Sequence, residues 1–410
     1  MEAGLEGIDA SDVSFLPIVS AYARELGVVE EINRLCGRTK GVDAGQVCLA
    51  LILDTLTGRS PLFRLEDSFA HLDVELLLGE GISVVQLNDD AVGRVLDRLY
   101  DVGTNKILSA VALRAVKLFD LDVSHVHQDT TSRSVYGDYE LREDGDSLPP
   151  FLITHGFSKD KRPDLKQLIH SLLCVDDGIP ISTKCEDGNA SDKVIDKNLL
   201  RLIGEICEVP VYAKGRPKAD GSRKIVGKTY RFLLDVESRE KDLERAHEEA
   251  GCFVLITNEP FESEGGMGSL ELLRLYKDQH SIEQNFGFLK DPLIVNALFL
   301  KSPKRIEALG LILVLALMVW RLMERTMRMS LRESGSKVTG WDEKPTSRPT
   351  SFMMTTKFLS IIVLRLGGRR RLGNPLRTVQ ADYLRILGLS PDVFVNPEAR
   401  MCRGVVSRPL

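Results

Sequence analysis

Apolar residues recur at helical spacing through the first 119 residues of the chain, with glycine and proline between the periodic segments. The segments with this spacing are Phe15–Leu35, Gly45–Leu56, Asp89–Tyr100 and Lys106–Leu118. Asn88 precedes two acidic residues at the start of one of them, where its side-chain oxygen can accept from the first free backbone amides. The pattern predicts an all-helical amino-terminal domain over residues 1–120.

The pattern changes after Leu121, where apolar and polar residues begin to alternate. Val123–Asp129 reads as a strand, and Leu168–Val175 and Ile179–Cys185 read as two more, joined by the turn sequence Asp176-Asp177-Gly178. Further along, the spacing predicts helices over Ser191–Cys207, Leu270–Leu289 and Ile306–Met329, and strands over Val209–Tyr212, Lys228–Val236 and Cys252–Thr257. The fold class is therefore expected to be mixed α/β, of the α+β type.

The remaining boundaries follow from composition. We expect a mixed core over residues 121–330, then a polar linker and a helical, basic carboxy-terminal part over 331–410, with a last helical element near Lys357–Leu366. The strongly apolar run Leu311–Trp320 is about half the length that a bilayer requires. We interpret it as part of a buried core helix and expect no membrane contact.

Composition narrows the class of protein. The chain has 410 residues, 43% of them hydrophobic and 28% charged, which is typical of a globular protein with two or three domains. A formal net charge of −5 provides no general basic field, so any contact with nucleic acid has to come from local patches. The seven cysteines are scattered without a C-x-x-C pair, and the first residues do not read as a signal peptide. These features favour a reduced, cytoplasmic protein without a zinc cluster or disulfide framework.

Asp129 is the first candidate for chemistry. It is expected at the tip of a strand, beside Thr130-Thr131-Ser132, where a carboxylate could bind Mg²⁺ through its oxygen atoms. The alternative is a turn in which the side chain of Asp129 accepts from the nearby backbone and closes the strand. The sequence leaves both interpretations open.

A second candidate is a polar stripe on the helix predicted over Leu270–Leu289 and its extension to residue 290. Four polar residues fall on one side of this helix, because the last three follow the first at offsets of three, seven and fourteen: Tyr276, Gln279, Glu283 and Lys290. Such a stripe can line a cleft. The alternative is an ordinary solvated helix face opposite a core-facing side made by Ile282, Phe286 and Leu289.

Two basic clusters could contact a phosphate backbone. One lies in a loop broken by glycine and proline and contains Lys214, Arg216 and Lys218. The other lies near the carboxyl end and contains Arg369, Arg370 and Arg371, with glycines nearby. A charged, solvated surface is the alternative interpretation of both clusters.

The pattern Y-x2-Q-x3-E-x6-K, from Tyr276 to Lys290, resembles the Tyr-Arg-Glu-Lys signature of DDE transposases in the group named after insertion sequence four, with Gln279 at the usual arginine position. The resemblance extends over nearly the whole chain. The other segments that carry it are Gly79–Asp90, His127–Ser132, Tyr136–Tyr139, Asp187–Lys193, Phe253–Asn258 and Pro303–Leu309.

This resemblance implies an RNase-H-like core that uses two divalent cations, Mg²⁺ or Mn²⁺, to cleave and transfer DNA strands at the ends of a mobile element. Asp129 would be the first carboxylate and Glu283 the last, with Tyr276, Gln279 and Lys290 in contact with DNA. The implied partners are the terminal inverted repeats of the element and a second copy of the chain in a homodimer. No small-molecule substrate is implied, and the implied location is the prokaryotic cytoplasm, at the nucleoid.

The sequence departs from the family at the middle catalytic aspartate. The strand that should carry it is absent, because Ile203–Glu208 runs almost directly into Val209–Tyr212. We infer an internal deletion that shortens the insertion expected over about residues 208–250 and leaves Asp235 as a weak candidate for the missing ligand. Val209–Tyr212 could fill the vacated place in the sheet. The alternative function is therefore an inactive transposase remnant that binds DNA or intact transposase.

Overall fold

The computed structural model describes residues 8–38, 41–58, 60–135, 139, 149–157, 162–176, 178–191, 208–212, 225–230, 266–278, 280–290, 300 and 302–402. The chain forms two compact units. The first comprises Met1–Ala190 and Asp278–Leu410, and the second comprises Ser191–Lys277.

The amino-terminal part of the first unit is helical, as the apolar spacing predicts. Its helices are α1 (Leu16–Glu25), α2 (Val28–Cys36), α3 (Ala44–Leu56), α4 (Leu65–Phe69), α5 (Val74–Leu78), α6 (Asp89–Val102) and α7 (Thr104–Phe119), with short 3-10 turns η1 (Leu62–Arg64) and η2 (Val84–Leu87). The predicted start of α6 is confirmed, because the Asn88 side chain accepts a hydrogen bond of 3.0 Å from the amide of Ala91.

A three-stranded antiparallel sheet follows, in the order β2 (His127–Val135), β3 (Lys166–Val175), β4 (Ile179–Glu186). The predicted β3–β4 hairpin is confirmed, and its turn contains Gly178 with a φ of 82°. The predicted end of the preceding strand at Asp129 is wrong. Asp129 is the third residue of β2, opposite Leu172, because the following threonines continue the strand and pair with β3.

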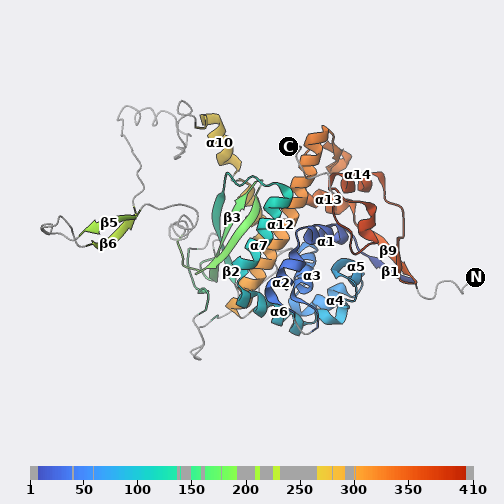
Figure 1. Ribbon diagram of the computed structural model, residues 1–410, viewed down its shortest axis with the longest axis horizontal. Helices are drawn as coiled ribbons and strands as arrows, with labels where there is room; N and C mark the ends of the chain where they lie inside the picture. Colours follow the sequence, from blue (N-terminus) through green and yellow to red (C-terminus); the bar gives the residue numbers. More distant parts are fainter. Residues whose placement is uncertain are drawn as a thin grey trace, which may run out of the picture. The chain divides into compact units, whose positions relative to one another are not determined.

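Helix α12 (Pro303–Ser334) is the structural centre of the first unit. It packs on β4, α6, α3 and α7, and Figure 1 shows it running between the sheet and the amino-terminal helices. It is the one described helix long and apolar enough to cross a membrane, and 89% of its most apolar window is buried inside the protein. The apolar run from Leu311 to Trp320 is thus part of a buried helix.

The carboxy-terminal part contains more strand than the sequence predicts. Its elements are β7 (Val338–Thr339), η4 (Trp341–Glu343), β8 (Pro345–Thr346), α13 (Ser351–Lys357), β9 (Ile362–Leu366), β10 (Arg369–Leu372), α14 (Thr378–Ile386) and η5 (Pro391–Phe394). The predicted helical element near Lys357–Leu366 is wrong beyond Lys357, because the β-branched residues Ile361–Val363 lead into strand β9. Strand β9 pairs with β10 and with β1 (Ile8–Asp12), a strand that helical spacing did not predict.

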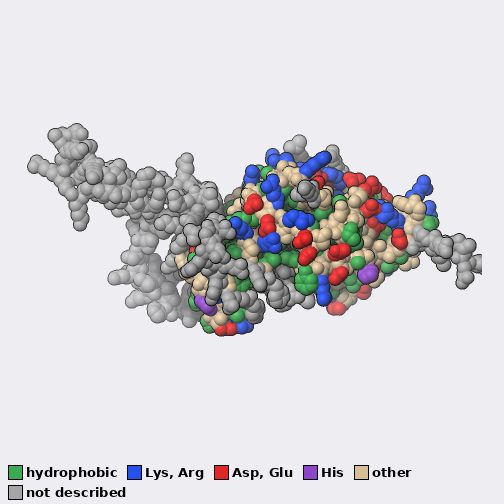
Figure 2. Space-filling view, turned by 90° about the horizontal axis from the view of Figure 1, so that it is seen from below, with side chains coloured by type: hydrophobic (Ala, Val, Ile, Leu, Met, Phe, Trp, Pro, Cys, Tyr) green, Lys and Arg blue, Asp and Glu red, His purple; other side chains and the backbone are tan. Residues whose placement is uncertain are grey.

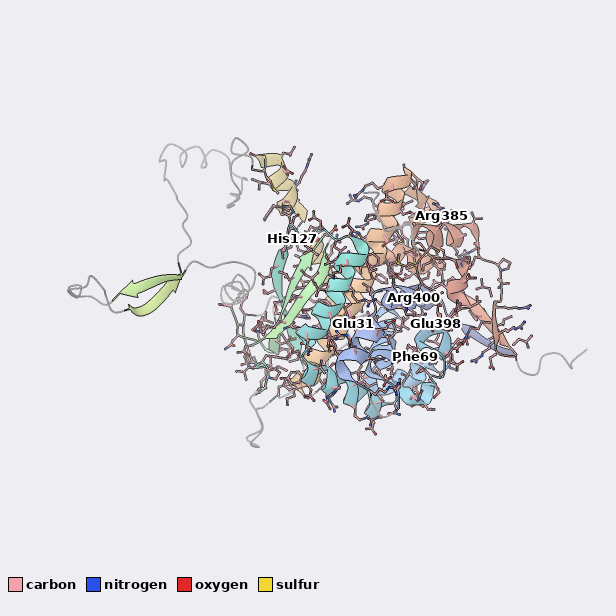
Figure 3. All side chains as sticks on the ribbon, in the orientation of Figure 1. Glu31, Phe69, His127, Arg385, Glu398 and Arg400 are labelled. Atoms are coloured by element: carbon pink, nitrogen blue, oxygen red, sulfur yellow. The ribbon has the colours of Figure 1, made fainter. Side chains whose placement is uncertain are left out.

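The boundaries of the compact units differ from those predicted from composition. Buried apolar residues from the predicted amino-terminal, middle and carboxy-terminal parts belong to one hydrophobic cluster. Arg400, near the carboxyl end, also forms a 3.2 Å ion pair with Glu30 of α2, and Figure 3 shows Arg400 lying over the amino-terminal helices. In the second unit, β5 (Glu208–Tyr212) pairs antiparallel with β6 (Ile225–Tyr230), and helix α10 spans Ser269–Asp278. Among the described strands, β5 is paired with β6 and not with the β2–β4 sheet.

Candidate functional site

Helix α11 (His280–Lys290) carries the glutamate of the sequence motif and packs on β2. Ile282, Phe286 and Leu289, which recur at spacings of four and three, are buried against the sheet side of the helix. The predicted core-facing side is confirmed. Asn285 is buried on the same side, with none of its surface exposed.

Two contacts fix the direction of α11 along β2. Midway along α11, Asn285 Nδ2 donates to the carbonyl oxygen of Gly178 at 2.7 Å and contacts Cys174 Sγ at 3.3 Å. Near its end, the Arg133 guanidinium donates to the carbonyl oxygen of Leu289. Cys174 is paired with the first residue of β2, so α11 runs along β2 in the same direction as the strand.

Asp129 lies on the face of the sheet that α11 covers. Residues directly opposite each other in an antiparallel pair share a face, so His127 lies on the face of Cys174, which Asn285 contacts. Alternation places Asp129 and Arg133 on this same face. The carboxylate of Asp129 is half-buried, and its Oδ1 accepts from the amide of Thr130 at 2.7 Å.

Glu283 lies on the flank of α11 that faces away from α12. Gln284 and Phe288 occupy the other flank, where they contact Arg321 and Trp320 of α12. A helix turns about 100° per residue, so Glu283 and Lys290 share a flank roughly opposite to those contacts. Because α12 packs on β4 and α11 on β2, the flank with Glu283 lies on the β2 side of the sheet.

The positions of the two carboxylates can be compared along the direction that β2 and α11 share. Asn285 of α11 contacts Cys174, which is paired with His127 of β2. From this level, Asp129 lies two residues further along β2, about 7 Å, and Glu283 lies two residues earlier on α11, about 3 Å. Asp129 and Glu283 therefore lie on either side of this level, each in the first half of its own element. The carboxylate of Glu283 is 69% exposed and is 3.0 Å from Nδ1 of His280.

The structure does not test several of the other predicted site residues. Tyr276 is exposed and belongs to the second unit, and Gln279 lies outside the described residues, so the four-residue stripe stays a prediction. The basic loop cluster of Lys214, Arg216 and Lys218 and the weak metal candidate Asp235 also lie outside the described residues.

The carboxy-terminal arginine cluster requires a correction. Arg370 does not present its guanidinium to solvent: its side chain is 6% exposed and forms an ion pair with Asp73 at 2.6 Å. Arg369 and Arg371, its neighbours on β10, are exposed. Alternation along the strand turns them to the face opposite Arg370. On the surface shown in Figure 2, Lys and Arg side chains are interspersed with Asp and Glu and do not form a single basic field.

Sequence reasoning missed the polar residues that hold α11 in place. Asn285 Oδ1 accepts from Arg321 Nε at 2.7 Å, so one buried amide joins α11 to α12 as well as to the β3–β4 turn. A signal was present, because Asn285 interrupts the apolar series of Ile282, Phe286 and Leu289 on the inward side of the helix. A polar residue at such a position normally has hydrogen-bond partners.

A polar cavity of about 620 Å³ lies near the same turn but does not include Asp129 or Glu283. Asp120, Asp122, Asp176 and Arg325 are among its lining residues. Arg325 donates to the carbonyl oxygen of Phe119 at 2.9 Å and to Asp176 Oδ2 at 2.7 Å. These bonds connect α12 to the end of α7 and to the β3–β4 turn, which gives Arg325 and Asp176 a structural role.

The donor set at the β2–α11 pair suits a hard cation. Mg²⁺ in proteins is commonly held by one or two carboxylates, with water and substrate phosphate completing its coordination, and Asp129 and Glu283 offer carboxylate oxygens. Within the part of the chain that the structure describes, no group of three His, Cys, Asp or Glu side chains is close enough to hold a metal ion. Asp129 and Glu283 remain the two predicted ligands, on elements that pack against each other.

Comparison with known proteins finds that part of the chain is similar to one sequence family. A domain of unknown function, DUF4277, matches residues 8–113, about a quarter of the chain. This segment begins at β1 and ends within α7. Neither the curated proteins nor the solved structures give a match.

Proposed function

We propose that the chain is a DDE transposase, with an RNase-H-like core that acts on DNA at the ends of its own element. The observation that carries this proposal is the relation of Asp129 to Glu283. Asp129 lies in the first half of β2 and Glu283 in the first half of α11, which packs on β2 and runs in the same direction. The antiparallel β2–β4 sheet covered by α11 and α12 supports the same proposal.

In this proposal Asp129 and Glu283 hold Mg²⁺ or Mn²⁺. The bound cation would activate the attacking oxygen and offset the charge that develops on the transferred phosphate. Lys290 shares the flank of Glu283 and would contact a DNA phosphate, while the exposed Arg369 and Arg371 would contribute salt-dependent affinity. The proposed partners are the inverted repeats and a second copy of the chain.

A second candidate is an inactive remnant that retains DNA or transposase binding. Its support is that the described residues contain no group of three His, Cys, Asp or Glu side chains close enough to hold a metal ion, whereas the family uses three carboxylates. Loss of one ligand from a site that acts by charge neutralisation would lower the cleavage rate by several orders of magnitude. The two candidates share the same fold and differ in catalysis.

The test is strand cleavage of a DNA fragment that contains the coding region of the chain with its flanking DNA on both sides. The reaction is run with Mg²⁺, with Mn²⁺ and with chelator, using the unaltered chain, Glu283→Ala and Glu333→Ala. Glu333 is an exposed glutamate on α12 and is the matched control. Cation-dependent cleavage that only Glu283→Ala abolishes supports the active transposase.

The other outcomes distinguish the inactive remnant from a result that contradicts both proposals. Salt-sensitive binding to the same fragment without cleavage supports the remnant. Neither cleavage nor binding above that of an unrelated fragment contradicts both proposals.

A further inference from the structure

We infer that Asn285 is the positioning residue of the candidate site: its buried amide sets the register of α11 on the sheet and so places Glu283 relative to Asp129. The inference rests on the proposed function of those two carboxylates. It concerns a residue two positions after Glu283 that the motif does not contain.

Asn285 has partners on three different elements. Its Nδ2 donates to the Gly178 carbonyl oxygen in the β3–β4 turn at 2.7 Å and contacts Cys174 Sγ on β3 at 3.3 Å. Its Oδ1 accepts from Arg321 Nε on α12 at 2.7 Å. The side chain is fully buried, so no solvent could replace these partners if the helix moved.

The apolar contacts of α11 cannot fix this register alone. Burial of Ile282, Phe286 and Leu289 is favourable but has no preferred direction, whereas a hydrogen bond weakens steeply when its geometry is lost. A slip of one helical turn moves Glu283 by about 5.4 Å and leaves a buried amide unpaired. Since Mg²⁺ ligands lie at about 2.0–2.1 Å from the cation, such a slip would separate Glu283 from a cation held at Asp129.

The β3–β4 turn approaches α11 closely beside Asn285. A Cβ on Gly178 would lie 2.9 Å from the Cβ of Ser281 and 3.4 Å from Nδ2 of Asn285, so the turn can reach the helix only because it has no side chain there. Arg321 is 10% exposed and orients the amide, because its Nε–H requires the oxygen of Asn285 on that side. The amide nitrogen is thereby directed to the turn.

The test uses two readouts, one of which needs no metal. Trp320 of α12 packs against Phe288 of α11 with ring centroids 6.1 Å apart, and the chain contains two tryptophans. In a Trp341→Phe background, the emission of Trp320 therefore reports the seating of α11. The second readout is Mn²⁺ affinity from an electron paramagnetic resonance titration, at a temperature where circular dichroism shows every variant folded.

Asn285→Ala is compared with Tyr22→Phe, which removes a 2.8 Å hydrogen bond from a buried tyrosine to the Leu387 carbonyl, far from α11 in the sequence. We expect Asn285→Ala to shift the Trp320 emission to the red and to weaken Mn²⁺ binding at least tenfold, and Tyr22→Phe to change neither. If Asn285→Ala does not fold, Asn285→Ser, which keeps a hydroxyl in the buried space, is measured with the same expectation.

Failure of the inference and failure of the proposed function give different results. An unchanged Trp320 emission and an unchanged Mn²⁺ affinity in the folded Asn285 variant would overturn the inference. If the unaltered chain binds no Mn²⁺, the proposed metal site fails, and the emission of Trp320 alone decides whether Asn285 sets the position of α11.

Discussion

Arg370 and Asp73 are 297 residues apart in the sequence, yet two hydrogen bonds of 2.6 and 2.9 Å join the guanidinium of one to the carboxylate of the other. Both side chains are almost completely buried, at 6% and 5% exposed. The pair fastens the β9–β10 hairpin to the start of α5, where Asp73 also accepts from the amide of Leu76 at 3.0 Å. It defines a structural role for an arginine that the sequence placed in a DNA-binding cluster.

Arg370→Ala should lower the free energy of unfolding by about 3–5 kcal/mol, because it leaves the Asp73 carboxylate buried without its counter-charge. Arg371→Ala is the matched control, since Arg371 is exposed on the same strand and its loss should change the free energy by less than about 0.5 kcal/mol. Urea denaturation of both variants measures the difference. Equal effects would show that the Arg370–Asp73 pair does not stabilise the hairpin.

The same pair predicts loss of stability in acid. Burial alone would raise the pKa of Asp73, but hydrogen bonds from Arg370 and from the Leu76 amide outweigh it and lower the pKa below its usual value. The folded state therefore binds this proton less readily than the unfolded state. The stabilisation is complete above the unfolded pKa of about 3.9 and is lost as the pH falls through the folded value. Denaturation curves between pH 5 and pH 2 should show a decline that is smaller in Asp73→Asn.

The buried ring of His170 predicts that the free energy of unfolding also depends on pH in a second range, above that of Asp73. Its ring is buried, and burial, assisted by the charge of Arg133, lowers its pKa to about 3. In the unfolded chain the ring binds a proton below about 6.5, so stability falls as the pH drops from 6.5 toward 3. The loss at pH 5 should be about 2 kcal/mol.

Thermal or urea unfolding at pH 7 and pH 5 measures the effect of His170. His170→Gln should reduce the difference between the two pH values, whereas His71→Gln, at an exposed position, should leave it unchanged. A difference that persists in His170→Gln would assign the pH dependence to other groups.

Gly178→Ala should lower the free energy of unfolding by more than the cost of placing an alanine in a left-handed backbone conformation. Gly178 has a φ of 82°, and a Cβ there would lie 2.9 Å from the Cβ of Ser281. Gly335 has a φ of 61° with open space around it, so Gly335→Ala isolates the cost of the left-handed backbone, about 1–2 kcal/mol. The excess in Gly178→Ala, measured by urea denaturation, reports the contact with α11. Equal losses of free energy of unfolding in the two variants would show that the turn is not in close contact with α11 at Gly178.

Replacing Arg369 and Arg371 together by alanine should weaken DNA binding without a loss of stability. Both residues are exposed on β10, and each neutralised phosphate contributes about one unit to the slope of the logarithm of affinity against the logarithm of salt concentration. We expect that slope to fall by about two units in fluorescence anisotropy titrations with duplex DNA. An unchanged slope would remove these arginines from the proposed DNA contacts.

Local signals explain what the sequence could predict. The β3–β4 hairpin follows from two apolar runs around Asp176-Asp177-Gly178, and the start of α6 follows from the cap at Asn88. Each requires only neighbouring residues. The extent of β2 was misjudged at Asp129, because Thr130 and Ser132 resemble a turn when their pairing with β3 is unknown.

Long-range partners explain what the sequence could not predict. Strand β1 exists because β9 pairs with it, from Ile8 opposite Leu366 to Asp12 opposite Ile362. The burial of Arg370 depends in the same way on Asp73, and neither partner is near in the sequence. At the candidate site, the motif indicated Glu283, whereas the role of Asn285 depends on the carbonyl oxygen of Gly178, which no side-chain pattern reveals.

The position of α12 in the sequence affects when the amino-terminal helices can complete their packing during synthesis. It spans residues 303–334, yet it is packed against α1, α3, α6 and α7, which end by residue 119. At a synthesis rate of about 5–20 residues per second, roughly 10–40 seconds separate the completion of α7 from that of α12. During this interval the nascent amino-terminal helices expose the apolar surface that α12 later covers. That surface is therefore open to other apolar contacts until α12 has been synthesised.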